Sequence, residues 1–322
     1  NGFDIDKDGN FLFLSYDKVF IVSQEFIKLR EFNHGIESTY IGCIASDSQG
    51  HIYIAEMSWG GTESVHKFNS FGEKLGQIGS KGPGETQFKT LYDIAVDRST
   101  DELITVSYEK NGIQRFSSEG ELISIYGYKN NDRDFRSSIA MVAVNNEGDI
   151  VGTPYTWPTQ TVYLLTKEYQ DERGYTSGQI DFYPADSTEA ESTEDSSSEA
   201  DSTEGSSSEE DSNEVESTED SSSEISSFEI FENSPIDESF SQIEDIAYDN
   251  DGNTYILESE EDRVYKFNSN GKYVSYFGST GQGNGEFDSP ENMIIYKGNL
   301  FVSDKDNQNI QELKFRILLF VF

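Results

Sequence analysis

The residues best suited to bind a cation lie near the start of the chain, in the segment Asp4-Ile5-Asp6-Lys7-Asp8-Gly9-Asn10. Carboxylates at alternate positions followed by a glycine match the first half of a calcium-binding loop, where oxygen ligands converge on one ion. The twelfth position of such a loop should hold a bidentate Glu, but here it is Ser15. Asp6 and Gly9 also recur as turn residues elsewhere in the chain. A turn is therefore the favoured interpretation, and a divalent cation such as calcium is the lesser alternative.

Other residue types that do chemistry are sparse. The chain contains three histidines, His34, His51 and His66, and one cysteine, Cys43. A zinc site needs several His or Cys ligands that converge, and a Ser-His-Asp triad needs a histidine held by a third group. The spacing of these residues supports neither arrangement. Cys43 stands at the start of a strand-like run and has no disulfide partner, so we expect a buried, inert thiol.

Two glycine-rich strings, at residues 79–84 and 278–285, superficially resemble phosphate-binding loops. Such loops precede a helix, whose N-terminus holds the phosphate, and these strings are followed by strand-like residues. Lys81 also lacks the Ser or Thr that should follow it. We therefore expect both strings to be connections in which glycine lets the chain turn sharply.

The charge balance bounds the possible partners. The 322 residues include 23 Lys and Arg against 61 Asp and Glu, which gives a formal net charge of −38. This field repels the phosphates of a nucleic acid and attracts basic or cationic partners, whether a protein or a small ligand. The sequence has no window of 18 apolar residues, so we expect no membrane span.

The elements that position these residues are short strands joined by tight turns. In residues 243–278, the strand-like runs IAYD and TYILES flank the turn Asp249-Asn250-Asp251-Gly252. The runs RVYKF and YVSYFG flank a second turn, Asn268-Ser269-Asn270-Gly271. Turns of this kind between alternating apolar and polar residues predict β-hairpins. The segment is predicted to be a four-stranded antiparallel meander, which needs neighbours of its own kind to bury its faces.

This unit repeats along the chain. Residues 79–97 align without a gap with residues 278–296, and the Asp at the end of the first strand recurs as Asp6, Asp47, Asp97 and Asp249. Six copies are expected, at about 1–34, 39–79, 80–127, 128–183, 229–278 and 279–322. The pattern of glycines, Phe, I-A-x-D, a turn, K-F and F-G resembles the NHL repeat. That resemblance implies an all-β fold, a six-bladed β-propeller of four-stranded antiparallel blades.

An acidic tract interrupts the repeats. Residues 186–229 contain seventeen Asp and Glu, no Lys or Arg, and repeated Ser-Thr-Glu and Ser-Ser-Ser-Glu units. Such a composition cannot bury enough apolar surface to offset the entropy of ordering. We expect a disordered insertion at 186–228 within one propeller domain, with blades 1–4 in residues 1–185 and blades 5–6 in residues 229–322.

The candidate ligand-binding residues lie where first strands begin and where second strands lead into third strands. Both kinds of connection leave a four-stranded meander at the same end, so these residues should gather at the mouth of a central channel. Aromatic side chains in such loops suit recognition, because they bring contact area at low entropic cost. The predicted set is Tyr92, Asp93, Glu244, Asp245, Glu291 and Asn292, with the loop aromatics Trp59, Tyr155 and Trp157.

Two functions are compatible with the sequence. The favoured one is a non-enzymatic binding or scaffold propeller without a cofactor, outside the cell or at its surface, for a protein or other extracellular ligand. The alternative is a six-bladed hydrolase or lyase with a divalent metal in the channel, held by Asp93, Asp245 and Asn292. Fold alone does not separate them, because propellers host many activities.

Overall fold

The structure is a computed structural model that describes residues 2–37, 40–57, 63–107, 112–126, 139–154, 162–165 and 240–314. Every regular element in this part of the chain is a β-strand. The strands belong to one compact unit formed by residues 1–185 and 225–322. Each sheet is an antiparallel meander in which every strand pairs with the next one in sequence.

Four of the six sheets have four described strands. Blade 1 contains β1 (Phe3–Ile5), β2 (Phe11–Leu14), β3 (Lys18–Val22) and β4 (Lys28–Asn33). Blade 2 contains β5 (Ile41–Ser46), β6 (Ile52–Glu56), β7 (Ser64–Phe68) and β8 (Lys74–Ile78). Blade 3 contains β9 (Leu91–Asp97), β10 (Glu102–Ser107), β11 (Ile113–Phe116) and β12 (Leu122–Tyr126). Blade 5 contains β16 (Ile243–Tyr248), β17 (Thr254–Glu258), β18 (Arg263–Phe267) and β19 (Tyr273–Phe277).

The other two sheets have three described strands. Blade 4 contains β13 (Ile139–Val144), β14 (Ile150–Pro154) and β15 (Tyr163–Leu165). Blade 6 contains β20 (Pro290–Tyr296), β21 (Asn299–Asp304) and β22 (Asn309–Lys314). The expected fourth strands of these blades, near residues 178–183 and 316–322, lie outside the described residues, as does the predicted insertion at 186–228.

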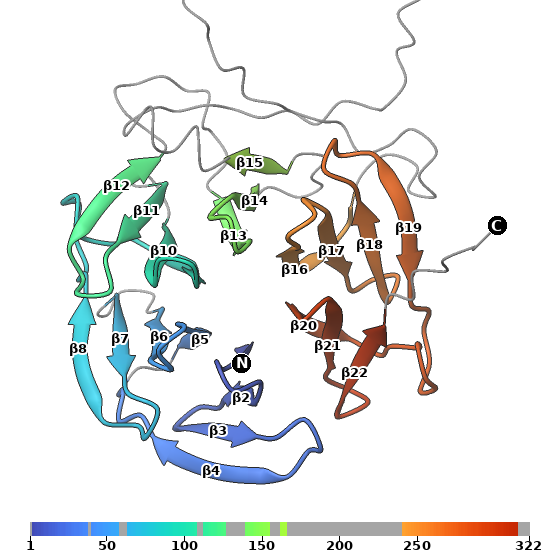
Figure 1. The fold of residues 1–322 in the computed structure, drawn as a ribbon, viewed down its shortest axis with the longest axis horizontal. Helices are drawn as coiled ribbons and strands as arrows, with labels where there is room; N and C mark the ends of the chain where they lie inside the picture. Colours follow the sequence, from blue (N-terminus) through green and yellow to red (C-terminus); the bar gives the residue numbers. More distant parts are fainter. Residues whose placement is uncertain are drawn as a thin grey trace, which may run out of the picture. The chain divides into compact units, whose positions relative to one another are not determined.

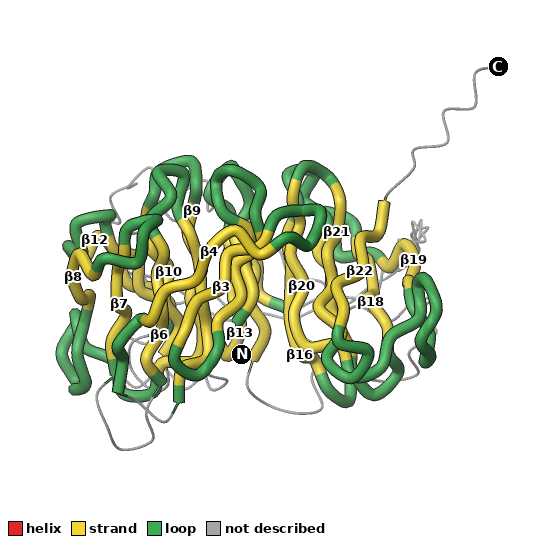
Figure 2. The backbone as a smooth tube through the Cα atoms, turned by 90° about the horizontal axis from the view of Figure 1, so that it is seen from below, coloured by secondary structure: helices red, strands yellow, loops and turns green. Residues whose placement is uncertain are grey.

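The six sheets surround a common axis (Figure 1). First strands such as β5, β13, β16 and β20 lie nearest the axis, and outer strands such as β4, β8, β12 and β19 lie at the rim. Each first strand contacts the first strand of the next blade, and β20 contacts β1. Seen from the side, the strands cross the ring from one end to the other and the turns lie at both ends (Figure 2). The predicted six-bladed β-propeller is confirmed.

The repeated Asp shapes the turn between the first two strands of a blade. One carboxylate oxygen of Asp249 accepts hydrogen bonds from the backbone N–H groups of Asp251 and Asn253, at 3.0 and 2.8 Å. Asp6 does the same for Asp8 and Asn10, at 2.9 and 2.8 Å. In both turns one carboxylate oxygen accepts the backbone hydrogen bonds that hold the turn together. The turn interpretation of this segment thus has direct geometric support.

Apolar side chains from facing sheets fill the spaces between blades. Between blades 2 and 3, Tyr53 and Val65 pack with Phe88 and Leu103, and all four are fully buried. Such burial contributes roughly 25 cal/mol per Å² of apolar surface removed from water. Because each sheet buries both of its faces, stability depends on neighbouring blades remaining in contact.

The first and last blades also meet through side chains. The Phe11 and Phe301 rings contact edge to face with centroids 5.4 Å apart. They belong to a cluster with Ile5, and β1 contacts β20. No described strand of blade 6 pairs with a described strand of blade 1. In the described residues, side-chain packing therefore closes the ring. The same described residues contain no helix long and apolar enough to cross a membrane.

Candidate ligand site at the mouth of the ring

Six equivalent positions define the site, one on or just before each first strand. In each blade this position lies four residues before the repeated Asp at the end of the first strand, or before the residue at the matching place in the repeat. We call them the axial positions, and they are occupied by Gly2, Cys43, Asp93, Met141, Asp245 and Asn292. We call the end of the ring where first strands begin the mouth end.

The axial carboxylates of Asp93 and Asp245 each join two blades. The Asp93 Oδ1 accepts a hydrogen bond from the N–H of Ile94 at 2.8 Å, and Oδ2 accepts one from the N–H of Val142 in blade 4 at 2.9 Å. In blade 5, the Asp245 Oδ1 accepts from the N–H of Ile246 at 2.8 Å. Its Oδ2 accepts from the N–H of Met293 in blade 6 at 2.7 Å. Both side chains therefore hold neighbouring first strands in register.

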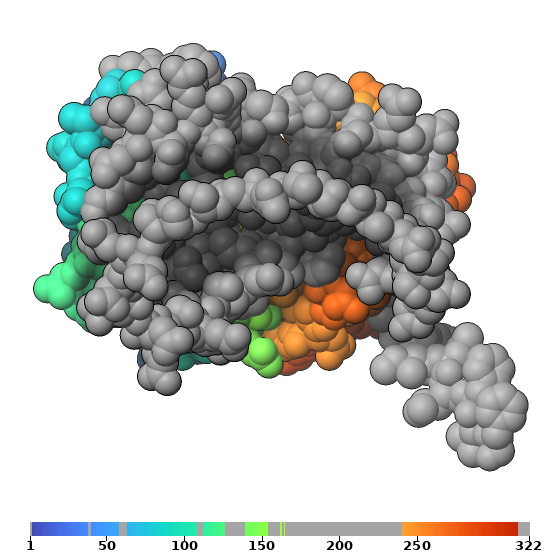
Figure 3. All heavy atoms as spheres, turned by 90° about the horizontal axis from the view of Figure 1, so that it is seen from above, coloured from blue at the N-terminus to red at the C-terminus, as the bar shows by residue number. Residues whose placement is uncertain are grey.

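Burial perturbs both axial carboxyls. Loss of solvent raises the pKa of Asp93 to about 6, although the N–H groups of Val142 and Ile94 oppose the shift. Burial likewise raises the pKa of Asp245 to about 8, and the negative charge of Asp93 adds to this effect. Blades 3 and 5 flank blade 4 (Figures 1 and 3), so the two carboxyls lie two blades apart. The charge of Asp93 nevertheless acts on Asp245. Proton exchange near neutral pH is therefore expected at this site.

Cys43 belongs to the same group of side chains. Its thiol donates a hydrogen bond to the backbone carbonyl of Tyr92 at 3.4 Å. Burial, followed by the charge of Asp93, raises the pKa of the Cys43 thiol well above its usual value. A thiol that stays protonated is a poor nucleophile. The sequence identified Cys43 as an inert thiol but did not predict that it would lie beside Asp93.

The other predicted acidic residues lie around these carboxyls. Glu244 Oε1 accepts a hydrogen bond from Ser259 Oγ at 3.0 Å, and Glu291 forms an ion pair with Lys305. Both glutamates are partly exposed. Asn292 is tied to β21, because its backbone N–H donates to Ser303 Oγ at 3.0 Å. The mouth end therefore carries four acidic residues, Asp93, Asp245, Glu244 and Glu291, and all four are partly exposed.

A small cavity opens beside Tyr92, between blades 2 and 3. It is lined by residues 40–42, by Met57 and by residues 90–92, and its volume is about 180 Å³. A Cβ at position 42 would lie 2.1 Å from Met57 Sδ, so a larger residue there would displace the flexible Met57 side chain. Tyr40 at its rim is 59% exposed. This cavity brings together the starts of β5 and β9 with the end of β6, as expected for the mouth end.

A buried Ser-His-Glu cluster also forms in blade 2, which the sequence did not predict. His66 Nε2 lies 2.8 Å from Glu56 Oε2 and 3.2 Å from Ser64 Oγ. In a catalytic triad the serine and the carboxylate contact opposite ring nitrogens. Here both contact the same nitrogen, and His66 Nδ1 has no hydrogen-bond partner within the described residues. All three side chains are buried. The arrangement does not support nucleophilic catalysis.

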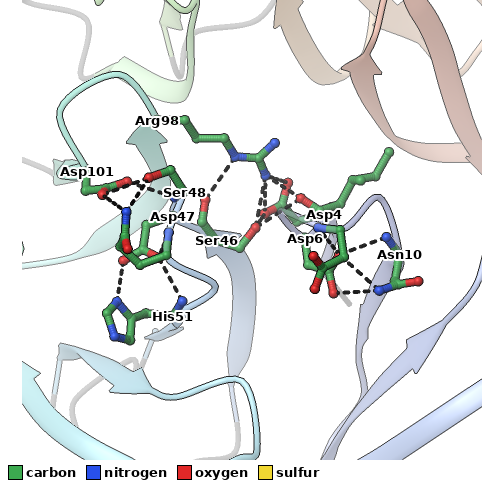
Figure 4. Close-up of polar contacts among 12 residues, drawn as sticks. Asp4, Asp6, Asn10, Ser46, Asp47, Ser48, His51, Arg98 and Asp101 are labelled. Carbon is green, nitrogen blue, oxygen red and sulfur yellow. Dashed lines mark hydrogen bonds and ion pairs between the residues drawn. The ribbon is translucent and has the colours of Figure 1, made fainter.

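A different polar network lies where first strands end. The Arg98 guanidinium in blade 3 donates to Asp4 Oδ1 and Oδ2 in blade 1, both at 3.1 Å, and to Ser46 Oγ in blade 2 at 3.0 Å (Figure 4). Burial raises the pKa of Asp4, and the charge of Arg98 opposes that shift. Arg98 follows β9 while Asp93 lies near its start, so the two are roughly 16 Å apart along the strand. This network ties three blades together at the end opposite the mouth.

The geometry gives little support to a metal in the channel. In the portion of the chain that the structure describes, no three His, Cys, Asp or Glu side chains converge in a way that could hold an ion. Both oxygens of Asp93 and of Asp245 already accept backbone hydrogen bonds. The raised pKa of Asp245, about 8, also favours its neutral form near pH 7, and a neutral carboxyl is a poor metal ligand. The predicted loop aromatics Trp59, Tyr155 and Trp157 lie outside the described residues.

Comparisons with known proteins agree with this architecture. A family model described as a 6-bladed beta-propeller matches residues 203–316, which is less than half of the chain. No curated protein sequence matched the chain.

Solved structures similar to this chain include the virginiamycin B lyase of Staphylococcus aureus, with a TM-score of 0.52 and 10% identity over 98% of this chain and 84% of that one. A structural genomics protein of unknown function from Bacteroides thetaiotaomicron has a TM-score of 0.57 and 14% identity over 97% and 68%. The Kuenenia stuttgartiensis hydrazine synthase has a TM-score of 0.55 and 10% identity over 98% and 95%. At such identities the likeness shows the fold alone: the chain folds as a six-bladed β-propeller.

Proposed function

We propose that this chain is a non-enzymatic binding propeller of the NHL type, whose mouth end recognises a basic or cationic protein partner. The repeat pattern in the sequence supports the NHL assignment, and the charge of the mouth supports the class of partner. The relatives named above add no activity to this proposal, since their likeness extends only to the fold.

One observation carries the proposal: the axial carboxylates serve to join blades. Asp93 holds blade 4 and Asp245 holds blade 6 through backbone N–H groups. Each oxygen of these two carboxylates accepts a backbone N–H, and this structural role accounts for both side chains without a catalytic one. The accessible charge at the mouth is negative, because Glu244 and Glu291 are partly exposed there beside Asp93 and Asp245. Clustered carboxylates favour a cationic partner and accelerate its approach.

The loop aromatics and the acidic insertion extend this proposal. We expect Trp59, Tyr155 and Trp157 to provide contact area for the partner at the same end of the ring. The insertion at 186–228 leaves between a fourth and a first strand, so it should add negative charge near the mouth. Both features select against anionic partners.

The test is a calorimetric titration of the full chain with an acetylated tetrapeptide of alternating Lys and Arg. The binding variant carries Glu244→Gln and Glu291→Gln, which remove two charges from the mouth. The matched control carries Asp8→Asn and Asp251→Asn, which remove two charges from exposed turns where first strands end. The mouth variant should bind several-fold more weakly, and the turn variant should bind like the parent chain. Equal losses in both variants would show attraction by overall charge alone.

Trp59→Ala and Trp157→Ala test the aromatic contribution separately. Each substitution should weaken binding of the same tetrapeptide without lowering the melting temperature of the protein. The proposal would be refuted if neither tryptophan substitution changes the affinity and if the affinity rises with salt concentration. Salt screens the attraction between exposed charges, so the proposed binding should weaken as salt is added.

A hydrolase or lyase remains the second candidate, because one observation favours it. A carboxyl whose pKa lies near neutrality, as burial makes that of Asp93 and Asp245, is a common feature of active sites. Asp93, Asp245 and Asn292 would be the ligands of a divalent metal, although the hydrogen bonds described above occupy both carboxylates. Elemental analysis of the purified chain separates the two functions. A stoichiometric divalent metal that is lost from an Asp93→Asn, Asp245→Asn variant would favour the enzyme.

A further inference from the structure

We propose that the cavity between blades 2 and 3 binds one aromatic or branched aliphatic side chain of a peptide partner, whose adjacent Lys or Arg lies at Asp93. This inference rests on the proposed function and adds a second recognition element to it. The partner would therefore present an apolar residue next to a basic one.

The size and lining of the cavity fit one such side chain. Its volume of about 180 Å³ is comparable with the roughly 150 Å³ of an apolar protein cavity that binds benzene. Its wall includes Ile41, Met57 and Leu91, and the last of these is fully buried. Met57 is unbranched and polarizable, so it adapts to rings and to aliphatic groups. A charged group alone would gain little in such a site.

The cavity is built into the scaffold at this point. Gly42 leaves the space that Met57 occupies, since any larger residue would meet its sulfur. The backbone of Leu91 is held in place, because its N–H donates a hydrogen bond to the buried carboxylate of Glu63 at 2.9 Å. The exposed ring of Tyr40 stands at the rim. A backbone held in this way lowers the entropic cost of binding, while the Met57 side chain can still adjust.

The cavity and the carboxyl are neighbours on the same strand. Tyr92 lines the cavity and Asp93 follows it, so their Cα atoms are about 3.8 Å apart. On the other wall, Gly42 precedes Cys43, whose thiol donates to the carbonyl of Tyr92. The N–H groups of Ile94 and Val142 and the Cys43 thiol all interact with the Asp93 carboxylate, whose two oxygens together have four lone pairs, so room remains for one further donor. An ammonium or guanidinium group can therefore pair with Asp93 while an adjacent side chain enters the cavity.

The methionines allow a direct test on the full chain. The sequence contains three, Met57, Met141 and Met293. Labelling their methyl groups with ¹³C gives one NMR signal at the cavity, from Met57, and an internal control at the buried Met293. The probes are acetyl-Lys-Phe-amide, acetyl-Lys-Gly-amide and acetyl-Glu-Phe-amide. The Lys-Phe peptide should shift the Met57 signal with an affinity about tenfold or more above the other two.

Two variants make the test specific. Thr90→Phe places a ring in the cavity from a partly exposed position and should abolish the Met57 shift. Gly42→Ala should displace the Met57 side chain and weaken binding of the Lys-Phe peptide. This variant provides an independent test if Thr90→Phe does not fold. A Met57 signal that does not respond to the Lys-Phe peptide, or a response that survives Thr90→Phe, would overturn the proposal.

Further outcomes identify the source of the ligand and separate the two proposals. If phenethylamine shifts Met57 and the Lys-Phe peptide does not, the ligand is a small amine and the peptide assignment is wrong. If binding of the Lys-Arg tetrapeptide requires Glu244 and Glu291 while no probe shifts the Met57 signal, the cavity proposal fails and the proposal that the mouth binds a cationic partner stands. If the Lys-Phe peptide shifts the Met57 signal while tetrapeptide binding does not change when those glutamates are replaced, the cavity proposal stands and the proposal that the mouth binds a cationic partner fails.

Discussion

The carboxylate of Asp245 accepts a hydrogen bond at 2.7 Å from the backbone N–H of Met293, and so ties the first strand of blade 5 to that of blade 6. Asp93 makes the same contact with Val142, between blades 3 and 4. Each blade packs on its neighbours through side chains, and these bonds add a polar link near the axis. The acidic residues of the mouth thus stabilise the ring as well as setting its charge.

The first prediction concerns the pH dependence of stability. Burial raises the pKa of Asp245 from an ordinary 3.8 to about 8. Between those values the folded chain binds more protons than the unfolded chain, so its free energy of unfolding decreases as pH rises through this window. Asp245→Asn should remove that contribution. Melting temperatures measured from about pH 5 to about pH 9 should decrease less steeply for the variant than for the parent chain.

Asn is a suitable replacement, because Asn292 occupies the equivalent axial position in blade 6. At about pH 5 the variant should lose on the order of 1 kcal/mol, through one weakened acceptor. Glu291→Gln is the matched control, since it removes a carboxylate from the mouth outside the axial positions, and its pH profile should follow the parent chain. An unchanged slope in Asp245→Asn would show that this carboxyl titrates as it does in the unfolded chain.

The second prediction concerns the buried arginine of blade 3. The Arg115 side chain is almost fully buried, donates to Asp97 at 2.7 Å and contacts Glu102. Arg115→Met leaves the buried carboxylate of Asp97 without its cation and should cost about 3–5 kcal/mol in denaturant unfolding. Adding Asp97→Asn should recover part of that loss. Lys18→Met, which breaks an exposed pair with Glu31, should leave the transition midpoint unchanged. A similar small effect for Arg115→Met would refute the prediction.

The third prediction separates two reasons for glycine in the connections between blades. Gly79 has a φ of +70°, and a Cβ there would lie 2.2 Å from the buried ring of Phe88. Gly285 has a φ of +78°, but nothing lies within 4 Å of its Cβ position. Gly285→Ala should cost only the left-handed backbone penalty of about 1–2 kcal/mol. Gly79→Ala should cost clearly more by thermal unfolding, and equal costs would mean that Phe88 moves aside freely.

The fourth prediction concerns the acidic insertion. Its composition cannot form a core, so deletion of residues 186–228 with a short Gly-Ser linker should leave the melting temperature unchanged within about a degree. The same deletion should weaken binding of the Lys-Arg tetrapeptide at low salt, because the deletion removes negative charge near the mouth. A loss of several degrees would show that the insertion packs against the ring.

The local structure followed from the sequence because it depends on short-range chemistry. Asx-Gly turns fix hairpins within a few residues, and Asp249 and Asn268 both accept the backbone bonds that such turns require. Alternating apolar residues then set which face of each strand is buried. Six copies of one meander leave few ways to bury both faces of every sheet, and a closed ring is one of them. Most of the described strands were therefore predictable.

The site was only partly predictable. Asp93 and Asp245 were identified from their place at the starts of first strands, and they do lie at equivalent positions. Their role as links between blades was not, because it depends on N–H groups 48 and 49 residues away in the chain. The same limit applies to Arg98, whose partner Asp4 is 94 residues distant. No pattern within one repeat indicates such a contact.

The sequence by itself determined the repeat, its strand order, its turns and the sign of its charge, because each of these depends on neighbouring residues or on composition. Only the tertiary structure decided which groups meet across the seams between blades. It placed Cys43 beside Asp93, raised the pKa of two carboxyls by burying them, and opened a cavity between residues 42 and 92. Those properties depend on distances and on exclusion of water, and both are fixed only when the blades pack together.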